Sequence, residues 1–442
     1  MERAIAADTS EQASTPARRA ALRILEGIHH GRPFDTARDR AVQGLDERDR
    51  RLAHELSAGV LRQQTVLDDL LAPLVPRGLD SVEAKLLDVL RLGAYQLRAV
   101  SRVPTHAAVS TSVDLARETG GSRAAGFVNA VLRRVAAAAP VTASASPDSA
   151  DALAREHSHP AWLVERWVGR FGLEETASLL AWNNATPSLV LQPARGQLEL
   201  LRARWESDGV HPEPAPYQAG LVVPSGSPTV LAGFAQGDFI VQDAAQALVA
   251  RFAAVPQGAT VYDACAAPGG KAIALGRIAG RVIAAERRKS RARRLVTNLE
   301  RAGSGREFAV VADAAAPPCR PVDVVLLDAP CLGTGTFARH PDARWRVRPD
   351  ALDGIVEEQR RMLESVAPVV RNGGLLVYAT CSLEPEENER QVATFLARHS
   401  EFHREPGDAV SADLLSDAGD LTILPQRHGM DGAFAARLRR DG

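Results

Sequence analysis

The sequence predicts a multidomain chain with an all-α N-terminal domain, a small α/β module and a C-terminal α/β domain built on a doubly wound parallel sheet. Apolar residues recur at helical spacing across residues 16–137, and no segment there alternates convincingly as a strand. Residues 138–152 are rich in Ala, Pro, Ser and Thr, which is typical of a linker. From residue 260 onward, apolar strand-like runs alternate with helical patterns, which favours a parallel sheet.

Length and composition limit the function classes. The chain has 442 residues, enough for two or three domains, and a net charge of -1, so no global basic field attracts nucleic acid. Its four cysteines form no C-x-x-C pair, which argues against a structural zinc site and a disulfide framework. No apolar run reaches the roughly 18 residues of a membrane span, and the N-terminus lacks the apolar core of a signal peptide. We therefore expect a cytoplasmic protein without metal or membrane contact.

Helical periodicity begins after a short N-terminal stretch. Residues 1–15 have no apolar period and are predicted to be a disordered tail. From Pro16 onward, apolar residues follow helical spacing. Further helices are expected at residues 46–62, 65–71, 81–98, 105–119 and 124–136. Gly and Pro residues separate them, including Gly120-Gly121 between the last two.

The remaining chain divides into a mixed module at 153–235 and a final domain at 236–442. In the module, residues 159–167 predict a helix and residues 187–193 predict a strand. Phe239–Ala245 opens the final domain. Its buried strands are expected at 260–263, 282–285, 308–312, 322–327 and 375–379.

Acidic residues follow three of these strands. Glu286, Asp313 and Asp328 end the second, third and fourth strands, and ligands of such sheets bind at the carboxyl ends of strands. An acidic rim suits an adenosyl ligand with a cationic sulfonium better than a pyrophosphate. Any one of these acids could be an ordinary turn residue at a strand end. That alternative is weaker for all three together, because they follow consecutive strands.

A glycine-rich bend joins the first strand to a helix. The segment Asp263-Ala264-Cys265-Ala266-Ala267-Pro268-Gly269-Gly270-Lys271 places backbone N–H groups and a helix N-terminus in one crevice. Two familiar nucleotide motifs do not fit it. The phosphate loop would need Gly at Cys265 and Ser or Thr at Ala272, and G-x-G-x-x-G is absent.

These nine residues resemble motif I of the RNA 5-cytosine methyltransferases, the family of the Sun/Fmu and NOL/NSUN proteins. The resemblance implies a Rossmann-like domain that binds S-adenosyl-L-methionine. The cofactor-binding residues it implies are Ala264, Cys265, Ala266, Ala267, Pro268, Gly269, Gly270, Lys271, Glu286, Arg291, Asp313 and Asp328. Lys271 is one of only three lysines in an Arg-rich chain, which supports a specific role. The alternative is an ordinary strand-to-helix turn, with Cys265 as a packing residue.

Two cysteines follow the fourth and fifth strands. Cys331 lies in Asp328–Gly335 and Cys381 in Tyr378–Pro385, and because these strands are usually neighbours, both thiols should reach one pocket. A thiolate that adds to C6 of cytosine makes C5 nucleophilic enough to accept a methyl group. Sequence alone leaves open which cysteine attacks, and a buried structural role is the alternative for either. The resemblance implies Cys381 as nucleophile, Cys331 as the group that assists product release, and Asp328 as the acid near N3. Cys319 has no assigned role.

The N-terminal domain resembles NusB, a helical RNA-binding factor of antitermination. The residues that carry this likeness are Ala17–Leu25, Asp46–Ala53, Leu90–Leu97 and Phe127–Arg134. The resemblance implies RNA binding. Residues 1–137 hold 20 Lys+Arg and 17 Asp+Glu, so a solvated helix surface is the alternative for most of these charges.

Further residues are candidates for RNA contact. Gln242 and Asp243 resemble the family's Q-D pair at the pocket edge, although Asp243 could equally be a helix N-cap. Arg339, Arg344 and Trp345 are typical of a loop that meets single-stranded RNA, and a structural Trp is the alternative. The chain departs from the family pattern where Val190 and Gln192 replace Arg and Asn, and where Ala433 replaces the first Phe of D-G-F-F.

The resemblance covers nearly the whole chain. It implies methylation of C5 of a cytosine in 16S ribosomal RNA, before assembly into the subunit, through a covalent cysteine intermediate. We expect a monomer. Two alternatives stay open: the same chemistry on transfer RNA, and a non-catalytic NusB-like RNA-binding or antitermination factor, against which the intact Asp328, Cys331, Cys381 and Lys271 speak.

Overall fold

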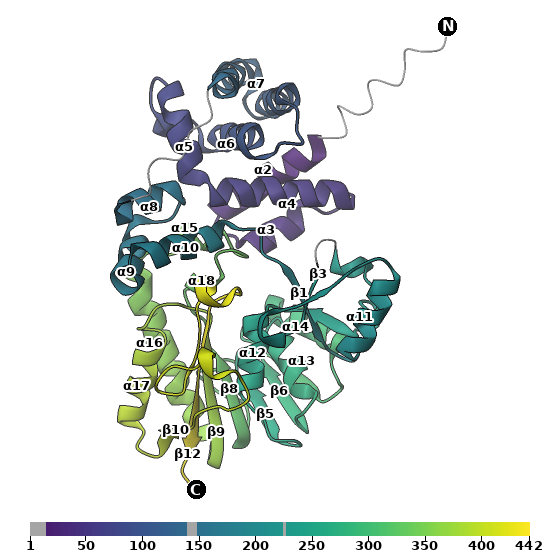
Figure 1. Cartoon of the computed structure of the whole chain (residues 1–442), viewed down its shortest axis with the longest axis vertical. Coiled ribbons are helices and arrows are strands. Elements are labelled where there is room, and N and C mark those ends of the chain that lie inside the picture. The colour runs from purple at the N-terminus through teal and green to yellow at the C-terminus, as the bar shows by residue number, and fades with distance from the viewer. Residues whose placement is uncertain (1–14, 139–147, 224–226) are drawn as a thin grey trace. The chain divides into compact units, whose positions relative to one another are not determined.

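The computed structural model describes residues 15–138, 148–223 and 227–442 (Figure 1). The chain forms two compact units, one made of residues up to Ala185 together with Phe337–Arg346, the other of Thr186–Thr336 and Val347–Gly442. Most of the predicted tail at 1–15 and of the predicted linker at 138–152 lies outside the described residues. The C-terminal boundary of each predicted segment lies inside a helix. The helix α2 begins at Thr15, and the helix α8 begins at Ala150.

The first unit is all-α. The all-α prediction covered residues 16–137, and the unit also includes helices up to Ala185 and the segment Phe337–Arg346. Its helices are α2 (Thr15–His29), α3 (Phe34–Ala41), α4 (Glu47–Arg62), α5 (Gln64–Leu71), α6 (Ala84–Ala99), α7 (Thr105–Ala137), α8 (Ala150–Glu156), α9 (Ala161–Phe171), α10 (Leu173–Asn184) and α15 (Ala343–Arg346). The predicted break inside α7 is confirmed, because Gly120 and Gly121 have non-helical backbone angles and Gly121 has φ +73°. The helix α3 was not predicted. Among the described residues, no helix is long and apolar enough to cross a membrane.

The second unit begins with a small antiparallel sheet in the order β2-β3-β1-β4. Its strands are β1 (Leu189–Pro193), β2 (Glu213–Pro214), β3 (Leu221–Val223) and β4 (Phe239–Val241). The predicted strand at 187–193 is confirmed as β1. β4 pairs with β1 through Leu191 and Val241, so the small sheet extends past residue 236, where the sequence suggested a boundary. The buried Trp205 of α11 (Leu198–Ser207) packs edge-on against Phe239.

The large sheet has the order β10-β12-β9-β8-β5-β6-β7, with β11 paired to β12. Its parallel strands are β5 (Thr260–Asp263), β6 (Arg281–Ala285), β7 (Glu307–Val310), β8 (Val322–Asp328) and β9 (Val370–Thr380), so all five predicted strands are confirmed. The antiparallel strands at the other edge are β10 (Phe402–Arg404), β11 (Leu421–Ile423) and β12 (Ala433–Arg440). They were not predicted.

Helices cover both faces of this sheet (Figure 1). Because side chains alternate along a strand, Val325 and Leu327 of β8 point to α16 (Pro349–Val366) and α17 (Glu389–Arg398), in a core with Met362 and Phe395. The alternate residues of β8 join a second core with α13 (Gly270–Gly276) and α14 (Lys289–Ala302). α12 (Ala244–Phe252) packs on β12 through Ala433 and Ala435.

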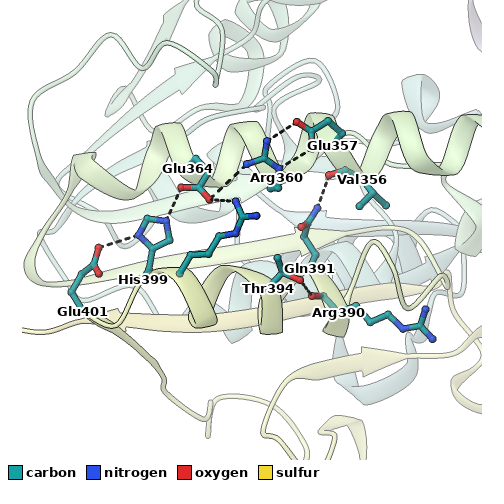
Figure 2. A network of polar contacts seen from close by, with 10 residues as sticks. Val356, Glu357, Arg360, Glu364, Arg390, Gln391, Thr394, His399 and Glu401 are labelled. Atoms are coloured by element: carbon teal, nitrogen blue, oxygen red, sulfur yellow. Dashed lines mark hydrogen bonds and ion pairs between the residues drawn. The ribbon is translucent and has the colours of Figure 1, made fainter.

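Polar contacts tie α16 to α17 and to the turn after α17 (Figure 2). Glu364 of α16 lies 2.8 Å from Nε2 of His399, whose Nδ1 lies 3.1 Å from Glu401. Nearer the other end, Nε2 of Gln391 donates to the carbonyl of Val356 at 2.7 Å. These contacts hold the two helices that back β8 and β9, the strands that carry the two candidate cysteines.

Candidate active site

The loop between β5 and α13 brings its backbone close to other parts of the second unit. Gly269 has φ +114°, in the left-handed region that favours glycine. A Cβ atom on Gly270 would lie only 2.8 Å from Nε2 of Gln242. A side chain at position 269 would be strained by the backbone angle, and one at position 270 would displace the Gln242 amide. This loop is the backbone predicted to hold a cofactor.

Asp263 ends β5 and is fully buried. Neither of its carboxylate oxygens makes a hydrogen bond of ordinary geometry with the described residues. Burial, and then the neighbouring Asp328, raise the pKa of Asp263 to about 7. A buried carboxylate whose oxygens make no hydrogen bond of ordinary geometry with the described residues suits a positively charged ligand group. We therefore add Asp263 to the candidate site, although it was not among the residues predicted from sequence.

Lys271 and Asp328 form the polar centre of the loop. Nζ of Lys271 donates to Oδ2 of Asp328 at 2.8 Å and also to Oε1 of Gln246. The Lys271 side chain is nearly buried, whereas that of Asp328 keeps 29% of its surface exposed. Asp328 therefore keeps an accessible oxygen at the carboxyl end of β8 while its charge is balanced by Lys271.

Glu286 directly follows β6 and is 6% exposed. Its Oε1 accepts from the backbone N–H of Arg288 at 2.7 Å, and its Oε2 lies 3.4 Å from Nε of Arg291. Arg291 also donates to the carbonyl of Ala267 at 2.9 Å, so it links the motif I loop to the end of β6. Asp313 lies a short loop beyond β7, where its Oδ1 accepts from the N–H of Ala315 at 2.9 Å.

These carboxylates fit the expected cofactor. Asp263, Glu286 and Asp328 lie at the carboxyl ends of β5, β6 and β8, which are adjacent in the sheet, and all three strands are parallel. A glycine-containing backbone turn beside a buried carboxylate suits an adenosyl group that carries positive charge. Cys265 packs against the neighbouring core, and burial and then Asp263 raise the pKa of its thiol, which keeps it protonated.

Cys331 and Cys381 are brought together, as their strand positions predict. β8 and β9 pair in parallel, and the two Sγ atoms lie 2.9 Å apart. The backbone N–H of Cys381 also points at Sγ of Cys331, at 3.3 Å. The hydrogen bond with Cys381, followed by burial, raises the pKa of Cys331 well above its usual range, so this thiol keeps its proton.

Glu387 holds the two cysteine loops together, and the sequence did not reveal it. This fully buried carboxylate accepts from the N–H of Leu332, at 3.0 Å, and from the hydroxyl of Ser382. It also accepts from Nε2 of Gln359 on α16, at 2.8 Å. Burial raises the pKa of Glu387 despite these donors. The only sequence signal was its place after the Thr-Cys-Ser run, among several Glu residues that look alike.

A second set of contacts joins the same loops through Thr334 and Gly335. Oγ1 of Thr334 accepts from the N–H of Leu383 at 2.8 Å, and the N–H of Gly335 donates to the carbonyl of Cys381 at 3.0 Å. A Cβ on Gly335 would lie 2.7 Å from Cα of Gly432. Gly335 is therefore held between the Cys381 loop and the segment that leads into β12.

Asp243 acts as the N-cap of α12, the alternative that the sequence left open. Its Oδ1 accepts from the N–H of Ala245 at 2.9 Å and from that of Asp431 at 3.2 Å. The Asp243 carboxylate thus holds the closing motif against the start of α12. Gln242 has a buried Oε1 without a hydrogen-bond partner among the described residues. RNA contact by Gln242 and Asp243 stays a prediction.

All three departures from the family pattern are accommodated inside the second unit. Nε2 of Gln192 donates to the carbonyl of Ala219 at 2.7 Å, so Gln192 supports the backbone of the small sheet. Val190 and Ala433 are both buried in one apolar core with α12. Their small apolar side chains therefore have a packing role.

The structure corrects the expected RNA contact of Arg344. This side chain is fully buried in the first unit, where its guanidinium donates to Oδ1 of Asn184 at 2.6 Å and to the carbonyl of Asn183 at 2.8 Å. Burial lowers the pKa of Arg344 to about 9. Trp345 donates from Nε1 to the carbonyl of Leu61 at 2.8 Å, which matches the structural alternative. The sequence could not distinguish RNA contact from a structural role, because Arg and Trp use the same donor groups to bind RNA and protein carbonyls. For Arg339, RNA contact stays a prediction.

Comparisons with known proteins bear on the whole chain. The family model described as 16S rRNA methyltransferase RsmB/F matches residues 252–439, and the NusB family model matches residues 15–137. The probable ribosomal RNA small subunit methyltransferase B of Synechocystis sp. is 36% identical, over 96% of this chain and 99% of that protein. The probable ribosomal RNA small subunit methyltransferase B of Bacillus subtilis is 30% identical, over 90% of this chain and 92% of that protein.

Solved structures agree with this fold. The crystal structure of PH0851 aligns with a TM-score of 0.81 and 25% identity, over 96% of this chain and 99% of that one. NSun6 from Pyrococcus horikoshii, solved with SFG, aligns with a TM-score of 0.57 and 20% identity, over 63% of this chain and 97% of that one, and supports the fold alone.

Within the described ranges, no group of three His, Cys, Asp or Glu side chains could hold a metal ion.

Proposed function

This chain belongs to the RsmB/F family of 16S rRNA methyltransferases, and we propose that it methylates C5 of a cytosine in 16S rRNA through a covalent cysteine intermediate. The observation that supports this chemistry most is the pair of thiols, Cys331 and Cys381, 2.9 Å apart on neighbouring strands. A methyltransferase acting on oxygen or an exocyclic amine has no need of two cysteines at one point. The site also provides an acid, Asp328, on the loop that carries Cys331.

Cytosine C5 needs activation because it is a weak nucleophile. In the proposed mechanism, the Cys381 thiolate adds to C6, which makes C5 enamine-like. Asp328, whose side chain is partly exposed beside Lys271, would act as the acid and donate a proton to N3 as negative charge develops there. After methylation, loss of the C5 proton and departure of the Cys381 sulfur restore the aromatic ring.

The surroundings of Cys331 support a role other than attack for this thiol. Because the hydrogen bond to Cys381 and burial keep Cys331 protonated, Cys331 is poorly suited to attack. A protonated thiol against the Cys381 sulfur can instead assist its departure from C6. We therefore assign attack to Cys381 and product release to Cys331.

S-adenosyl-L-methionine is the proposed cofactor. Asp263, Glu286, Lys271 and the backbone of Gly269–Gly270 would hold it at the carboxyl edge of the sheet. When bound, it supplies an electrophilic methyl group on a positively charged sulfur. The acidic residues would attract this positive charge, and Asp313 would lie near the adenine.

The RNA must present its target base outside a helix. A cytosine stacked in a duplex cannot bring C6 to a buried thiol, so the target lies in a loop or is flipped out. Free 16S rRNA before subunit assembly is the substrate we propose, because flanking nucleotides are then accessible. The protein would act in the cytoplasm, where this RNA is made.

A denaturing gel tests the proposal directly. Cys331→Ala and Cys381→Ala proteins are incubated separately with unmodified 16S rRNA and S-adenosyl-L-methionine. We expect a slow-migrating protein–RNA adduct with Cys331→Ala only, because attack is intact and release is impaired. An adduct with Cys381→Ala only would reverse the two roles. If neither variant traps RNA and the wild type transfers no methyl group to 16S rRNA, the proposal is wrong.

Bisulfite sequencing of RNA from a deletion strain identifies the substrate. We expect loss of one 5-methylcytosine signal in 16S rRNA, with transfer RNA unchanged. A loss confined to transfer RNA would overturn the proposed substrate while leaving the chemistry standing.

A further inference from the structure

A dense run of positive charge lies around the start of α14. Of the eight residues 287–294, six are Arg or Lys and none is acidic, although the whole chain has a net charge of -1. The six side chains are all exposed: Arg287, Arg288, Lys289, Arg291, Arg293 and Arg294. The helix α14 buries only Ala292, Leu295 and Ala302, and the cations occupy the remaining surface of its first turns. We define these six side chains as the α14 basic surface.

The position of these charges is unfavourable for the isolated protein. The N-terminus of a helix carries partial positive charge, so acidic residues are preferred there, yet the first turn of α14 has none. Neighbouring cations also repel each other. Such an arrangement lowers stability unless a negatively charged partner neutralises it, so its presence argues for a function other than folding.

Half of the α14 basic surface has no acidic partner among the residues that the structure describes. Arg287 lies 3.5 Å from both Asp313 and Glu358, and Arg291 lies 3.4 Å from Glu286. These two residues attach the surface to the rim of the proposed cofactor site. For Arg288, Lys289 and Arg293, no ion pair forms with any described residue.

The surface lies at the same edge of the sheet as the thiols. α14 follows β6, and the order β9-β8-β5-β6 places β6 three strands from β9, which leads into Cys381. At the usual spacing, three strand intervals amount to about 14 Å. Nucleotides that flank a cytosine at Cys381 are therefore within reach of α14.

We propose that the α14 basic surface binds the phosphodiester backbone of the substrate RNA beside the target cytosine. This inference rests on the proposed function for the identity of the RNA. Phosphate contact by flexible, exposed cations gives affinity and orientation without sequence preference, and the base itself is read at the catalytic site. Sequence-specific readout by this surface is not part of the proposal.

A charge-neutralised variant tests the surface without touching the cofactor site. The variant combines Arg288→Gln, Lys289→Gln and Arg293→Gln. Its matched control combines Arg371→Gln, Arg390→Gln and Arg398→Gln, which remove the same charge from exposed cations that each pair with an acidic side chain. Affinity for an unmodified 16S rRNA fragment is measured across a range of salt concentrations, together with S-adenosyl-L-methionine binding and single-turnover methyl transfer at saturating RNA.

We expect the dependence of log K on log salt to become shallower by about two units in the α14 variant, because each lost phosphate contact removes about 0.7. RNA affinity at low salt should fall about tenfold or more, while cofactor affinity and the saturated rate stay within about twofold. The control should match the wild type. An unchanged salt slope in the α14 variant, or an equal change in the control, would overturn the inference. The proposed function would be contradicted instead if the wild type shows the expected salt dependence of RNA binding but transfers no methyl group.

Discussion

The Sγ atoms of Cys331 and Cys381 lie 2.9 Å apart, although 50 residues separate them in the chain. The contact exists because β8 and β9 are parallel neighbours and each thiol follows the carboxyl end of its strand. The remaining cysteines, Cys265 and Cys319, instead pack against an apolar core.

The first prediction is that mild oxidation joins Cys331 to Cys381 in a disulfide, because the two thiols are already in contact. Peptide mass spectrometry after diamide treatment should find this crosslink and no other. Methyl transfer should disappear with it and return after dithiothreitol. Cys319→Ser serves as the control and should oxidise and recover like the wild type. If Cys331 and Cys381 both still react with an alkylating reagent after oxidation, they have formed no disulfide, and the observed geometry would be contradicted.

The second prediction concerns Glu387, which we regard as a positioning residue for the cysteine loops. Glu387→Ala removes the acceptor shared by Leu332, Ser382 and Gln359, at about 1–3 kcal/mol for each donor that stays unsatisfied. We expect a clear loss of unfolding free energy and at least about a tenfold slower single-turnover rate. Cofactor affinity, measured by calorimetry, should change little because the hydrogen bonds of Glu387 are made with the cysteine loops and α16.

The variant Glu387→Gln tests whether the negative charge of Glu387 matters, because it keeps the size of the side chain. The amide keeps the size of the side chain but replaces one acceptor oxygen by a donor that faces other donors, so it should also slow adduct formation. The exposed neighbour Glu389→Ala is the control and should cost less than about 1 kcal/mol. A Glu387→Gln protein with wild-type rate and stability would show that the carboxylate does not position the thiols.

The third prediction concerns Arg344, which the structure moves from an RNA contact to a packing role. Arg344→Ala removes a buried guanidinium from the carbonyl of Asn183 and Oδ1 of Asn184, and should cost about 3 kcal/mol or more. Denaturant unfolding followed by circular dichroism measures the loss. The exposed Arg348→Ala should cost less than about 1 kcal/mol.

RNA binding distinguishes the two roles of Arg344. If the side chain only packs, the folded Arg344→Ala protein should keep the wild-type salt dependence of RNA affinity. A salt slope reduced by about 0.7 with wild-type stability would restore the phosphate contact that the sequence suggested.

The fourth prediction follows from the pKa of Asp263, raised from 3.8 to about 7 by burial and by Asp328. The carboxylate form attracts a cationic ligand, and its population rises as pH passes through 7. Affinity for S-adenosyl-L-methionine should therefore increase about tenfold from pH 6 to pH 8, because binding selects the deprotonated protein. Asp263→Asn should bind more weakly at pH 8 and lose this pH dependence.

The same group affects the ligand-free protein with the opposite sign. Because the folded-state pKa lies above the unfolded value, the folded protein binds more protons between about pH 4 and pH 7, and stability falls as pH rises through that range. Asp263→Asn should remove this fall, seen as a higher melting temperature at pH 8 but not at pH 4. Affinity and stability in Asp263→Asn that follow pH as in the wild type would exclude Asp263 as the titrating group.

Much of the fold was accessible from sequence because it depends on local patterns. The five parallel strands and the break at Gly120-Gly121 follow from apolar runs and backbone-breaking residues, which act over a few positions. β12 was missed because its pairing with β9 is antiparallel and non-local, and its Ala- and Arg-rich sequence has weak strand character.

The candidate site also contains residues that could be predicted from sequence and residues that could not. Sequence was enough to predict candidate catalytic residues, since Asp328, Cys331 and Cys381 each lie in a motif at a strand end. It could not assign Glu387 or Arg344, because an isolated Glu or Arg does not indicate which buried donors or carbonyls it will meet.

The sequence by itself determined the five parallel strands, most of the N-terminal helices, the motif I loop and the chemical groups available at the strand ends, because these depend on neighbouring residues. Only the tertiary structure decided that the thiols of Cys331 and Cys381 are in contact, that Glu387 bridges their loops, and that Arg344 is buried. These relationships join residues far apart in the chain, and strand pairing and burial are set by the packing of the whole unit rather than by local preference.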